Sequence, residues 1–458
     1  MDSAGRSPVA GGTVSSISTD GTDFQGPSGP GPAASFMSST ASTASPEDVS
    51  SPPAVGVLHA EPAVQEEQKS LRQEKSAWIV VRTFTPAWFT VNMGTGIVSI
   101  LLHNIPYNGT WLYWISVIIF ALNVLLFTIF SFISVLRYFT YPGLWTAMVR
   151  HPVVPLFLGA FPMGLATIIE MIVLVCVPAW GHWAITLAWT LWWIDSVMAI
   201  AICYLVPFAM IHLHDTKLQA ANAAWLLPIA SVIVASGVGG VVSSVLVNEQ
   251  HALWTLVVSY ILWGTSIPLS MSYLVIYLHR LLMHNLPPRE VIVSAFIPVG
   301  TLGQGAFAIM QFGKVASMIF TKTNTLGGAD THSGDILYVF GWIAGLIMWA
   351  YGLVWLFFAL AGITRGKVPF NLGWWGCTFP LGVWASATLS FGEEMPSTFF
   401  KVLGTVFSVI VTLLWMMVSI YTIRNIANGQ IFVAPDFNFW QELKNRPPKE
   451  NESSGDNV

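Results

Sequence analysis

Charged side chains are scarce in this sequence. Asp, Glu, Lys and Arg make up 9% of the 458 residues, whereas hydrophobic residues make up 54%. Soluble domains carry about a quarter charged residues, so the composition excludes an ordinary soluble protein and indicates an integral membrane protein. The short alternating segments of a membrane β-barrel are also missing, and apolar runs of about 20 residues take their place. We therefore expect an all-α polytopic membrane protein.

Cysteines and clusters of ionisable residues are few as well. The three cysteines, Cys176, Cys203 and Cys377, all lie in apolar runs, which predicts buried free thiols and no disulfide framework. The histidine pair in His212-Leu213-His214-Asp215 is interpreted as part of a short loop at a membrane surface and not as a metal site. No ATP-binding motif and no cluster of catalytic residue types is present, so we predict no enzyme, cofactor or metal, and no nucleic-acid partner.

The chain divides into a tail, a membrane domain and a second tail. Residues 1–76 are rich in Ser, Thr, Gly, Pro and Ala and contain no apolar run, which predicts a disordered cytoplasmic tail. They lack the basic start and apolar core of a signal peptide. Their Ser and Thr content suits either regulatory phosphorylation or an inert solvated tail. Residues 77–425 are predicted to form the transmembrane domain, and residues 426–458 a cytoplasmic C-terminal tail.

Hydropathy predicts ten membrane-spanning helices, arranged as five helical hairpins. They cover approximately residues 80–102, 111–136, 153–177, 183–210, 224–247, 252–278, 291–319, 336–362, 370–392 and 399–423. The loops after the even-numbered segments carry most of the basic residues, namely Arg137, Arg150, Lys217, Arg280, Arg289, Arg365 and Lys367. The positive-inside rule then predicts that both termini are cytoplasmic and that Asn108, in an Asn-Gly-Thr sequon, is an extracellular glycosylation site.

The odd-numbered segments share a pattern in which proline is followed by glycine within about ten residues. The prolines recur roughly every 65–80 residues, the length of two spans with their loops. We expect these five helices to be kinked and to line a pore, with the even-numbered helices outside them. The alternative is that Gly and Pro only allow close helix packing. The predicted lining residues are Gly94, Thr95, Gly96, Pro162, Gly164, Pro228, Ser231, Pro298, Gly300, Thr301, Gly303, Thr378, Pro380 and Gly382.

Fixed charge is absent from the central parts of these odd-numbered segments, because their charged residues lie near the segment ends: Arg82, Glu170, Lys314 and Glu393. A pore without fixed charge can still favour anions, because exposed backbone N–H groups and half-helix N-termini carry partial positive charge. Asp195 is the ionisable residue that lies clearly inside a span, in an even-numbered segment. It is interpreted either as a proton-linked residue or as a structural hydrogen-bonding anchor.

Three stretches resemble the tellurite-resistance/dicarboxylate transporter family, which includes the plant slow anion channels. They are Trp88–Gly96 (WFTVNMGTG), Ile297–Gly305 (IPVGTLGQG) and Trp374–Pro380 (WWGCTFP). Within this family, the Trp-Trp-Ile-Asp run ending at Asp195 makes the chain look most like the fungal sulfite efflux pumps. The resemblance covers the ten predicted spans and neither tail.

The resemblance implies five inner and five outer helices, a homotrimer, and one pore per subunit. By its Thr-Phe-Pro context, Phe379 matches the phenylalanine that plugs the family's pore. The implied function is a plasma-membrane anion transporter that exports sulfite or bisulfite. The alternatives are a C4-dicarboxylate (malate) permease or another small-anion channel of the same fold. The charge-poor odd-numbered segments favour a small inorganic anion, because a dicarboxylate would be expected to need more basic contacts.

Overall fold

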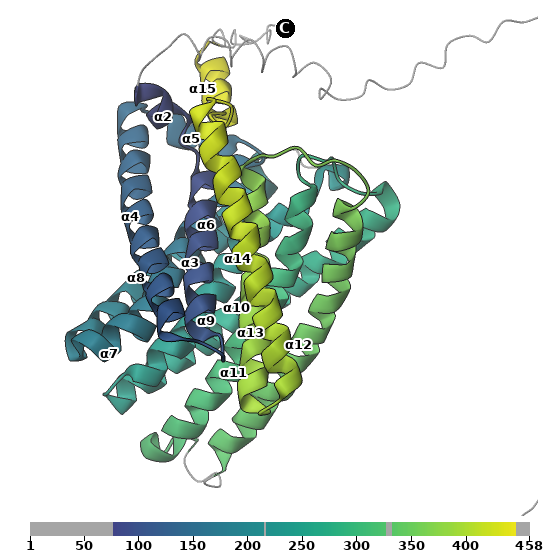
Figure 1. Ribbon diagram of the computed structural model, residues 1–458. Helices are drawn as coiled ribbons and strands as arrows, with labels where there is room; N and C mark the ends of the chain where they lie inside the picture. The colour runs from purple at the N-terminus through teal and green to yellow at the C-terminus, as the bar shows by residue number, and fades with distance from the viewer. Residues whose placement is uncertain (1–76, 215–216, 327–331, 446–458) are drawn as a thin grey trace, which may run out of the picture. The chain divides into compact units, whose positions relative to one another are not determined.

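The computed structural model describes residues 77–214, 217–326 and 332–445, and all secondary structure in these ranges is helical (Figure 1). The predicted N-terminal tail, Asp215 and the last 13 residues of the predicted C-terminal tail lie outside the described ranges. Each of the ten predicted segments contains a long helix. In chain order these are α3 (Phe89–Asn104), α4 (Thr110–Thr140), α6 (Ala160–Met171), α8 (His182–Leu213), α9 (Leu227–Val245), α10 (Glu249–His284), α11 (Ile297–Thr323), α12 (Ser333–Ile363), α13 (Trp375–Glu394) and α14 (Thr398–Ala427).

Short helical elements extend or connect the long ones. The third segment continues beyond α6 through a π-helical turn, η3 (Ile172–Cys176), and α7 (Val177–Trp180). The helices α2 (Ala77–Thr83), α5 (Leu144–Arg150) and α15 (Pro435–Asn445) gather at one end of the bundle (Figure 1).

Among the described helices, eight are long and apolar enough to cross a membrane, which confirms a polytopic membrane protein. The remaining two of the ten, α3 and α13, are shorter or more polar. Both are almost entirely buried between the other helices.

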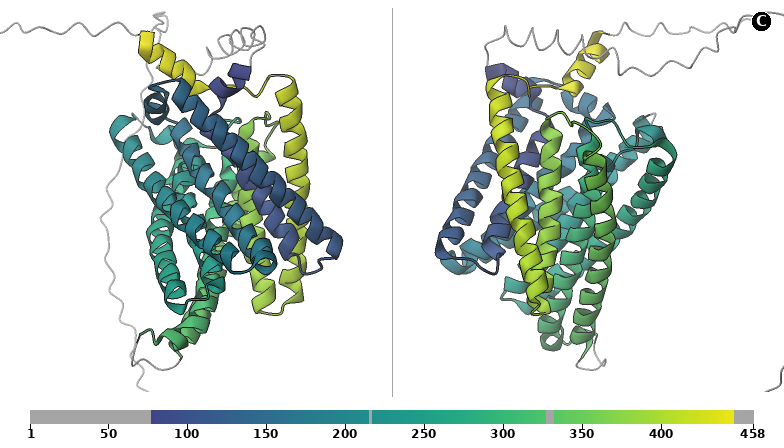
Figure 2. Two further views of the ribbon diagram at one scale, coloured as in Figure 1. Left: turned by 90° about the vertical axis from the view of Figure 1, so that its left-hand side faces the viewer. Right: turned by 45° about the vertical axis from the view of Figure 1, so that its right-hand side comes forward.

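Burial separates the helices into an inner and an outer set. All of the most apolar 18-residue window of α9 is buried, and the corresponding share is 89% for α11 and 78% for the third segment. In α4 and α14 the buried share of this window is only 17% and 22%. Figure 2 shows α4 running obliquely across the outside of the bundle. The helices of the odd-numbered predicted segments, α3, α6, α9, α11 and α13, are therefore inside. The helices of the even-numbered segments have apolar outer faces, as expected for helices that meet lipid.

The five inner helices form a closed ring. Contacts join α3 to α6, α6 to α9, α9 to α11, α11 to α13, and α13 back to α3. The approach of α11 to α13 is especially close, since a Cβ added at Gly303 would lie 2.6 Å from the Cα of Trp384. Each outer helix packs on a member of the ring: α4 on α3, α8 and α10 on α9, α12 on α11, and α14 on α13.

Four of the five inner helices have their proline at or before the helix start, which corrects the expectation that proline kinks them. Pro86 lies in the 3₁₀ turn η1 (Pro86–Trp88), and Pro228 and Pro298 lie at the second positions of α9 and α11. Pro162 is the third residue of α6. At these positions no intrahelical N–H bond is lost, so proline starts a helix without bending it. Among the inner helices, Pro380 of α13 is the proline within the helix.

The segment after α14 ends in a helix that the sequence pattern did not predict. Helix α15 packs against α5, with Phe437, Tyr141 and Trp440 in aromatic contact. Below them, Nη2 of Arg137 at the end of α4 donates a 2.9 Å hydrogen bond to Oδ2 of Asp436. Neither side chain is exposed. This buried ion pair ties the C-terminal segment to the membrane domain.

Candidate functional site

Three neighbouring cavities lie inside the ring of inner helices. The largest, of about 460 Å³, shares Met93, Leu227 and Ile297 with a second cavity of about 20 Å³. The second shares Val234, Gln304 and Phe379 with a third cavity of about 10 Å³. Because neighbouring cavities have walls in common, they form a series that leads from the N-terminal ends of the inner helices into the centre of the ring.

The largest cavity is surrounded by the N-terminal ends of all five inner helices. Each helix is preceded there by a 3₁₀ turn: η1, η2 (Val154–Gly159), η5 (Ala223–Leu226), η6 (Ile292–Phe296) and η7 (Leu372–Trp374). The Oδ1 atoms of Asn222 and Asn371 accept hydrogen bonds from the N–H groups of Ala224 and Gly373. The first N–H group of each inner helix donates to a carbonyl oxygen of the 3₁₀ turn before it. The partial positive charge at this cavity therefore comes from the five helix dipoles.

His151 stands in the wall of this largest cavity. Its Nδ1 lies 3.2 Å from the backbone nitrogen of Val153 and 3.3 Å from that of Val154, and accepts from both. Burial lowers the pKa of His151 below its usual value. The imidazole is thereby kept in the neutral form that accepting these two hydrogen bonds requires.

The second cavity is lined mostly by apolar side chains, including Met93, Met163 and Ile233. The Thr301 hydroxyl donates to the Pro298 carbonyl oxygen of its own helix at 2.9 Å. This part of the series offers few polar contacts. A small solute would therefore pass it without binding strongly.

Phe379 lines both the second and the third cavity, as Val234 and Gln304 also do. Only 5% of its surface is exposed. The residue belongs to α13 and directly precedes Pro380, which lies inside the helix. An uncharged ring therefore belongs to the wall that the two cavities have in common.

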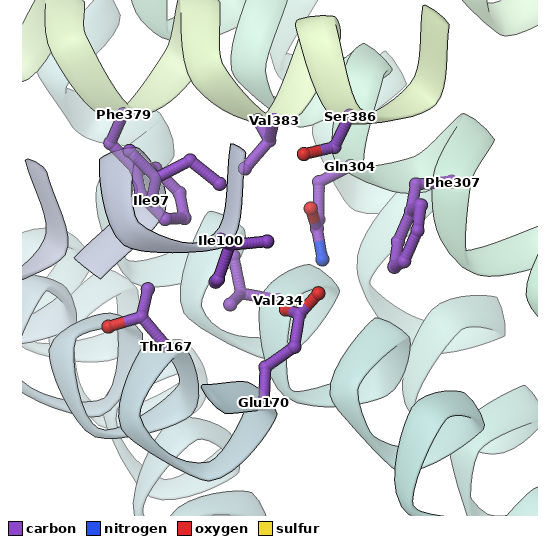
Figure 3. Close-up of a pocket in the computed structure, with 10 residues that line it drawn as sticks. All are labelled: Ile97, Ile100, Thr167, Glu170, Val234, Gln304, Phe307, Phe379, Val383 and Ser386. Atoms are coloured by element: carbon purple, nitrogen blue, oxygen red, sulfur yellow. The ribbon is translucent and has the colours of Figure 1, made fainter. Parts of the chain in front are cut away.

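The third cavity contains the polar side chains of Glu170, Gln304, Thr167 and Ser386. In Figure 3 the carboxylate of Glu170, from α6, and the amide of Gln304, from α11, point toward each other across the cavity. Glu170 is 8% exposed and Gln304 is 4% exposed. Within the described residues neither side chain has a hydrogen-bond partner, so both polar ends are directed at the cavity itself.

A hydrogen-bond network holds the wall beside Glu170. Asn92 of α3 donates through Nδ2 to Oδ1 of Asn123 at 3.2 Å, and Asn123 of α4 donates to Oγ1 of Thr167 at 3.2 Å. The Thr167 hydroxyl donates to the Gly164 carbonyl oxygen at 2.8 Å. Three helices are thus joined one turn before Glu170, which fixes the direction in which α6 presents its carboxylate.

Four of the residues predicted to line a pore do line these cavities: Gly300, Thr301, Pro380 and the predicted gate Phe379. The other predicted residues lie at contacts between helices or within a helix turn. An added Cβ at Gly94 would meet Thr378, at Gly96 Thr167, at Gly164 Asn92, at Gly303 Trp384 and at Gly382 Ile97. These glycines let neighbouring helices approach, which is the packing role considered as the alternative.

The remaining predicted lining residues are also engaged by the protein. Thr95 accepts a 3.1 Å hydrogen bond from Nε1 of Trp415 in α14, on the outer side of α3. The hydroxyls of Ser231 and Thr378 donate to carbonyl oxygens three residues earlier, at 2.7 and 2.8 Å. Pro162 is buried in the first turn of α6, and Pro228 lies beside Gly159.

Asp195 and Asn108 lie away from the three cavities. Asp195 is fully buried on α8, and its two carboxylate oxygens have no hydrogen-bond partner among the described residues. Asn108 is exposed in the loop between α3 and α4, where its Nδ2 donates to the His103 carbonyl oxygen at 2.9 Å. The three cysteines are buried and free, as predicted.

Sequence reasoning missed Glu170 and Gln304 as residues of this site. Glu170 was placed near the end of its segment, but the helix continues to Trp180. Ten further residues correspond to about 15 Å of helix, so the carboxylate lies well inside the bundle. The uninterrupted apolar run after Glu170 was the signal for this depth.

Comparison with known proteins agrees with a transport role. The family described as voltage-dependent anion channel matches residues 83–423. The chain is 49% identical over 367 residues to a sulfite efflux pump of Arthroderma benhamiae, covering 80% of this chain and 97% of the relative. A sulfite efflux pump of Candida albicans is 29% identical, over 72% of this chain and 71% of the relative. A malic acid transport protein of Schizosaccharomyces pombe is 24% identical, over 81% and 84%.

These matches confirm the resemblance noted in the sequence, and the structure supplies the multi-pass helical architecture that goes with it. The chain therefore belongs to the voltage-dependent anion channel family, as the fungal sulfite efflux pumps similar to it also indicate.

Proposed function

We propose that this protein exports sulfite or bisulfite across the plasma membrane, along a path through the ring of inner helices that Phe379 closes. The observation that carries the proposal is the series of cavities, which begins at five helix N-termini and has Phe379 in the wall that two of the cavities share. The high identity to sulfite efflux pumps supports the choice of substrate.

The cavity walls suit weak binding of a small anion. Among the described residues that line the three cavities there is no Lys or Arg. A fixed positive charge would hold an anion tightly and slow its release, whereas backbone N–H groups attract it without trapping it. This favours a small inorganic anion over malate, whose two carboxylates need more basic contacts.

Transport follows the existing gradients, since the sequence contains no ATP-binding motif. An inside-negative membrane potential assists the exit of an anion by about 2.3 kcal/mol per charge per 100 mV. We propose ten membrane crossings with α3 and α13 buried inside, both termini in the cytoplasm, glycosylation at Asn108, and a homotrimer with one path per subunit. The largest cavity is then the cytoplasmic entrance.

Purified protein in liposomes tests the substrate. We expect release of radioactive sulfite that is several times faster than release of malate, nitrate or chloride under the same membrane potential. Deletion of the gene should also raise the sulfite sensitivity of the cell. Preferential malate transport would support the dicarboxylate permease, and absence of sulfite release with unchanged sensitivity would refute the proposal.

A further inference from the structure

Glu170 is an acidic group inside the proposed anion path, where an anion transporter would be expected to avoid negative charge. Its side chain is 92% buried, given its 8% exposure, and it lines the cavity directly beyond Phe379. Gln304 faces it and supplies amide N–H groups, while Ser386 adds a hydroxyl group that has no partner among the described residues. Amide and hydroxyl groups are donors that a small oxyanion can accept from, and one carboxylate lies among them.

No positive side chain balances that carboxylate. The cavity lining contains no Lys, Arg or His among the described residues. No other titratable group of the surrounding elements lines the cavity. Absent from the lining are His103 on α3, Cys176 in η3, the α8 residues His182, Asp195, Cys203, Tyr204 and His212, and the α11 residues Lys314 and Lys322. Helix α9 carries no titratable side chain, and the ionisable groups of α4 and α13 do not line the cavity either.

An ionised Glu170 and a bound anion would therefore repel each other without compensation. Repulsion between two like charges in contact at such a partly buried site lowers occupancy roughly a thousandfold. A protonated Glu170 removes this repulsion. It also becomes a hydrogen-bond donor, so its O–H and the Gln304 amide can both donate to the oxygens of one anion.

We propose that Glu170 and Gln304 form a binding site for a small oxyanion, and that the anion occupies it when Glu170 carries a proton taken up from water. The proposal rests on the proposed function, because it places the site in that anion path. Transport through the site then decreases as the pH rises, since fewer molecules have a protonated Glu170. Glu170 thus makes the path sensitive to pH without taking part in any covalent step.

The test compares wild-type protein with Glu170→Gln, which has nearly the same shape and is always neutral. Release of radioactive sulfite is measured from proteoliposomes at equal inside and outside pH, from about pH 5.5 to about pH 8, at zero membrane potential. Taking the ratio of variant to wild type at each pH cancels the protonation of sulfite itself. We expect a ratio near one at the acidic end that rises by up to about tenfold per pH unit at the alkaline end.

Asp195→Asn is the matched control, because Asp195 is also a buried acid but does not line the cavities. Its ratio should stay constant across the pH range. If Glu170→Gln is poorly folded, Glu170→Ala replaces it in the test. This variant also has no ionisable group at position 170, so its transport should not show the pH dependence that Glu170 causes.

Three results would overturn the inference while the proposed function stands. The first is a ratio of Glu170→Gln to wild-type transport that stays constant across the pH range. The second is a folded Glu170→Gln protein that transports sulfite at no pH. The third is a ratio of Asp195→Asn to wild-type transport that rises with pH as much as the Glu170→Gln ratio does. Absence of sulfite release from the wild type at every pH would instead refute the proposed function, and the inference with it.

Discussion

Arg137 and Asp436, 299 residues apart in sequence, form a 2.9 Å ion pair in which neither side chain is exposed. The same guanidinium donates through Nε to the Arg82 carbonyl oxygen at 3.1 Å. One side chain therefore joins the segment before α3, the end of α4 and the start of α15. Pro435, next to Asp436, lines the largest cavity, so this pair also fixes one wall of the proposed entrance.

Asp436→Ala should lower the stability of the protein by about 3–5 kcal/mol, because it leaves the Arg137 charge buried without a partner. Thermal unfolding of the purified protein in detergent would show this as a large decrease in melting temperature. Glu442→Ala, an exposed acid on the same helix, is the control and should change little. In the double variant Arg137→Met/Asp436→Leu much of the loss should be recovered, and equal losses in both variants would contradict this account.

Phe379→Ala should raise anion conductance roughly tenfold, which corresponds to a barrier lower by about 1.4 kcal/mol. The reason is that removal of the ring should join the two cavities that Phe379 lines. Electrical recording from lipid bilayers would measure the change. Phe391 is also a buried ring of α13, but it does not line these cavities. Phe391→Ala should therefore reduce stability without raising conductance. Equal conductance increases in the two variants would exclude a specific role for Phe379.

Gly237→Ala should slow sulfite transport by about threefold to tenfold, the effect of weakening one hydrogen bond. An added Cβ would lie 2.6 Å from Nε2 of Gln304, and that flexible side chain would turn away from the cavity. Gly264→Ala, where nothing lies within 4 Å of an added Cβ, should transport normally. In a Gln304→Ala background the Gly237→Ala change should have almost no further effect, and an additive loss would refute the coupling.

His151 should make the protein less stable at acidic pH. Its pKa is lowered in the folded protein by burial, so the unfolded chain binds a proton more readily. Stability from this residue is present above about pH 6.5, the usual histidine pKa, and decreases as the pH falls toward the lower folded value. Melting temperatures of wild type and His151→Asn, compared at neutral and acidic pH, would show a smaller acid-induced decrease in the variant. An identical decrease in both would contradict this account.

The division into inner and outer helices could be predicted from the sequence, because hydropathy and the positions of Pro and Gly repeat along the chain. The motif around Phe379 even located a residue that lines two cavities. The shape of the inner helices could not be predicted in the same way. Proline has opposite effects at the first turn and in the middle of a helix, and only the exact start of the helix distinguishes the two, as at Pro228 and Pro380.

The cavity lining was harder to predict than the fold. Glycine carries no side chain that reveals which neighbour it faces, and so Gly94 and Gly96 were assigned to a pore although they meet Thr378 and Thr167. Glu170 was passed over because the length of its helix beyond η3 was underestimated. Its direction depends on the contacts of α6 with α3 and α9, which arise only from tertiary packing.

The parallel direction of the five inner helices has an electrical consequence. Their N-terminal ends all surround the same cavity, so the backbone dipoles add along the axis and do not cancel. The two mouths of the path are therefore not equivalent, and opposite voltages of equal size should drive unequal anion currents. We expect this rectification to depend on the backbone of the ring more than on the side chains that line it.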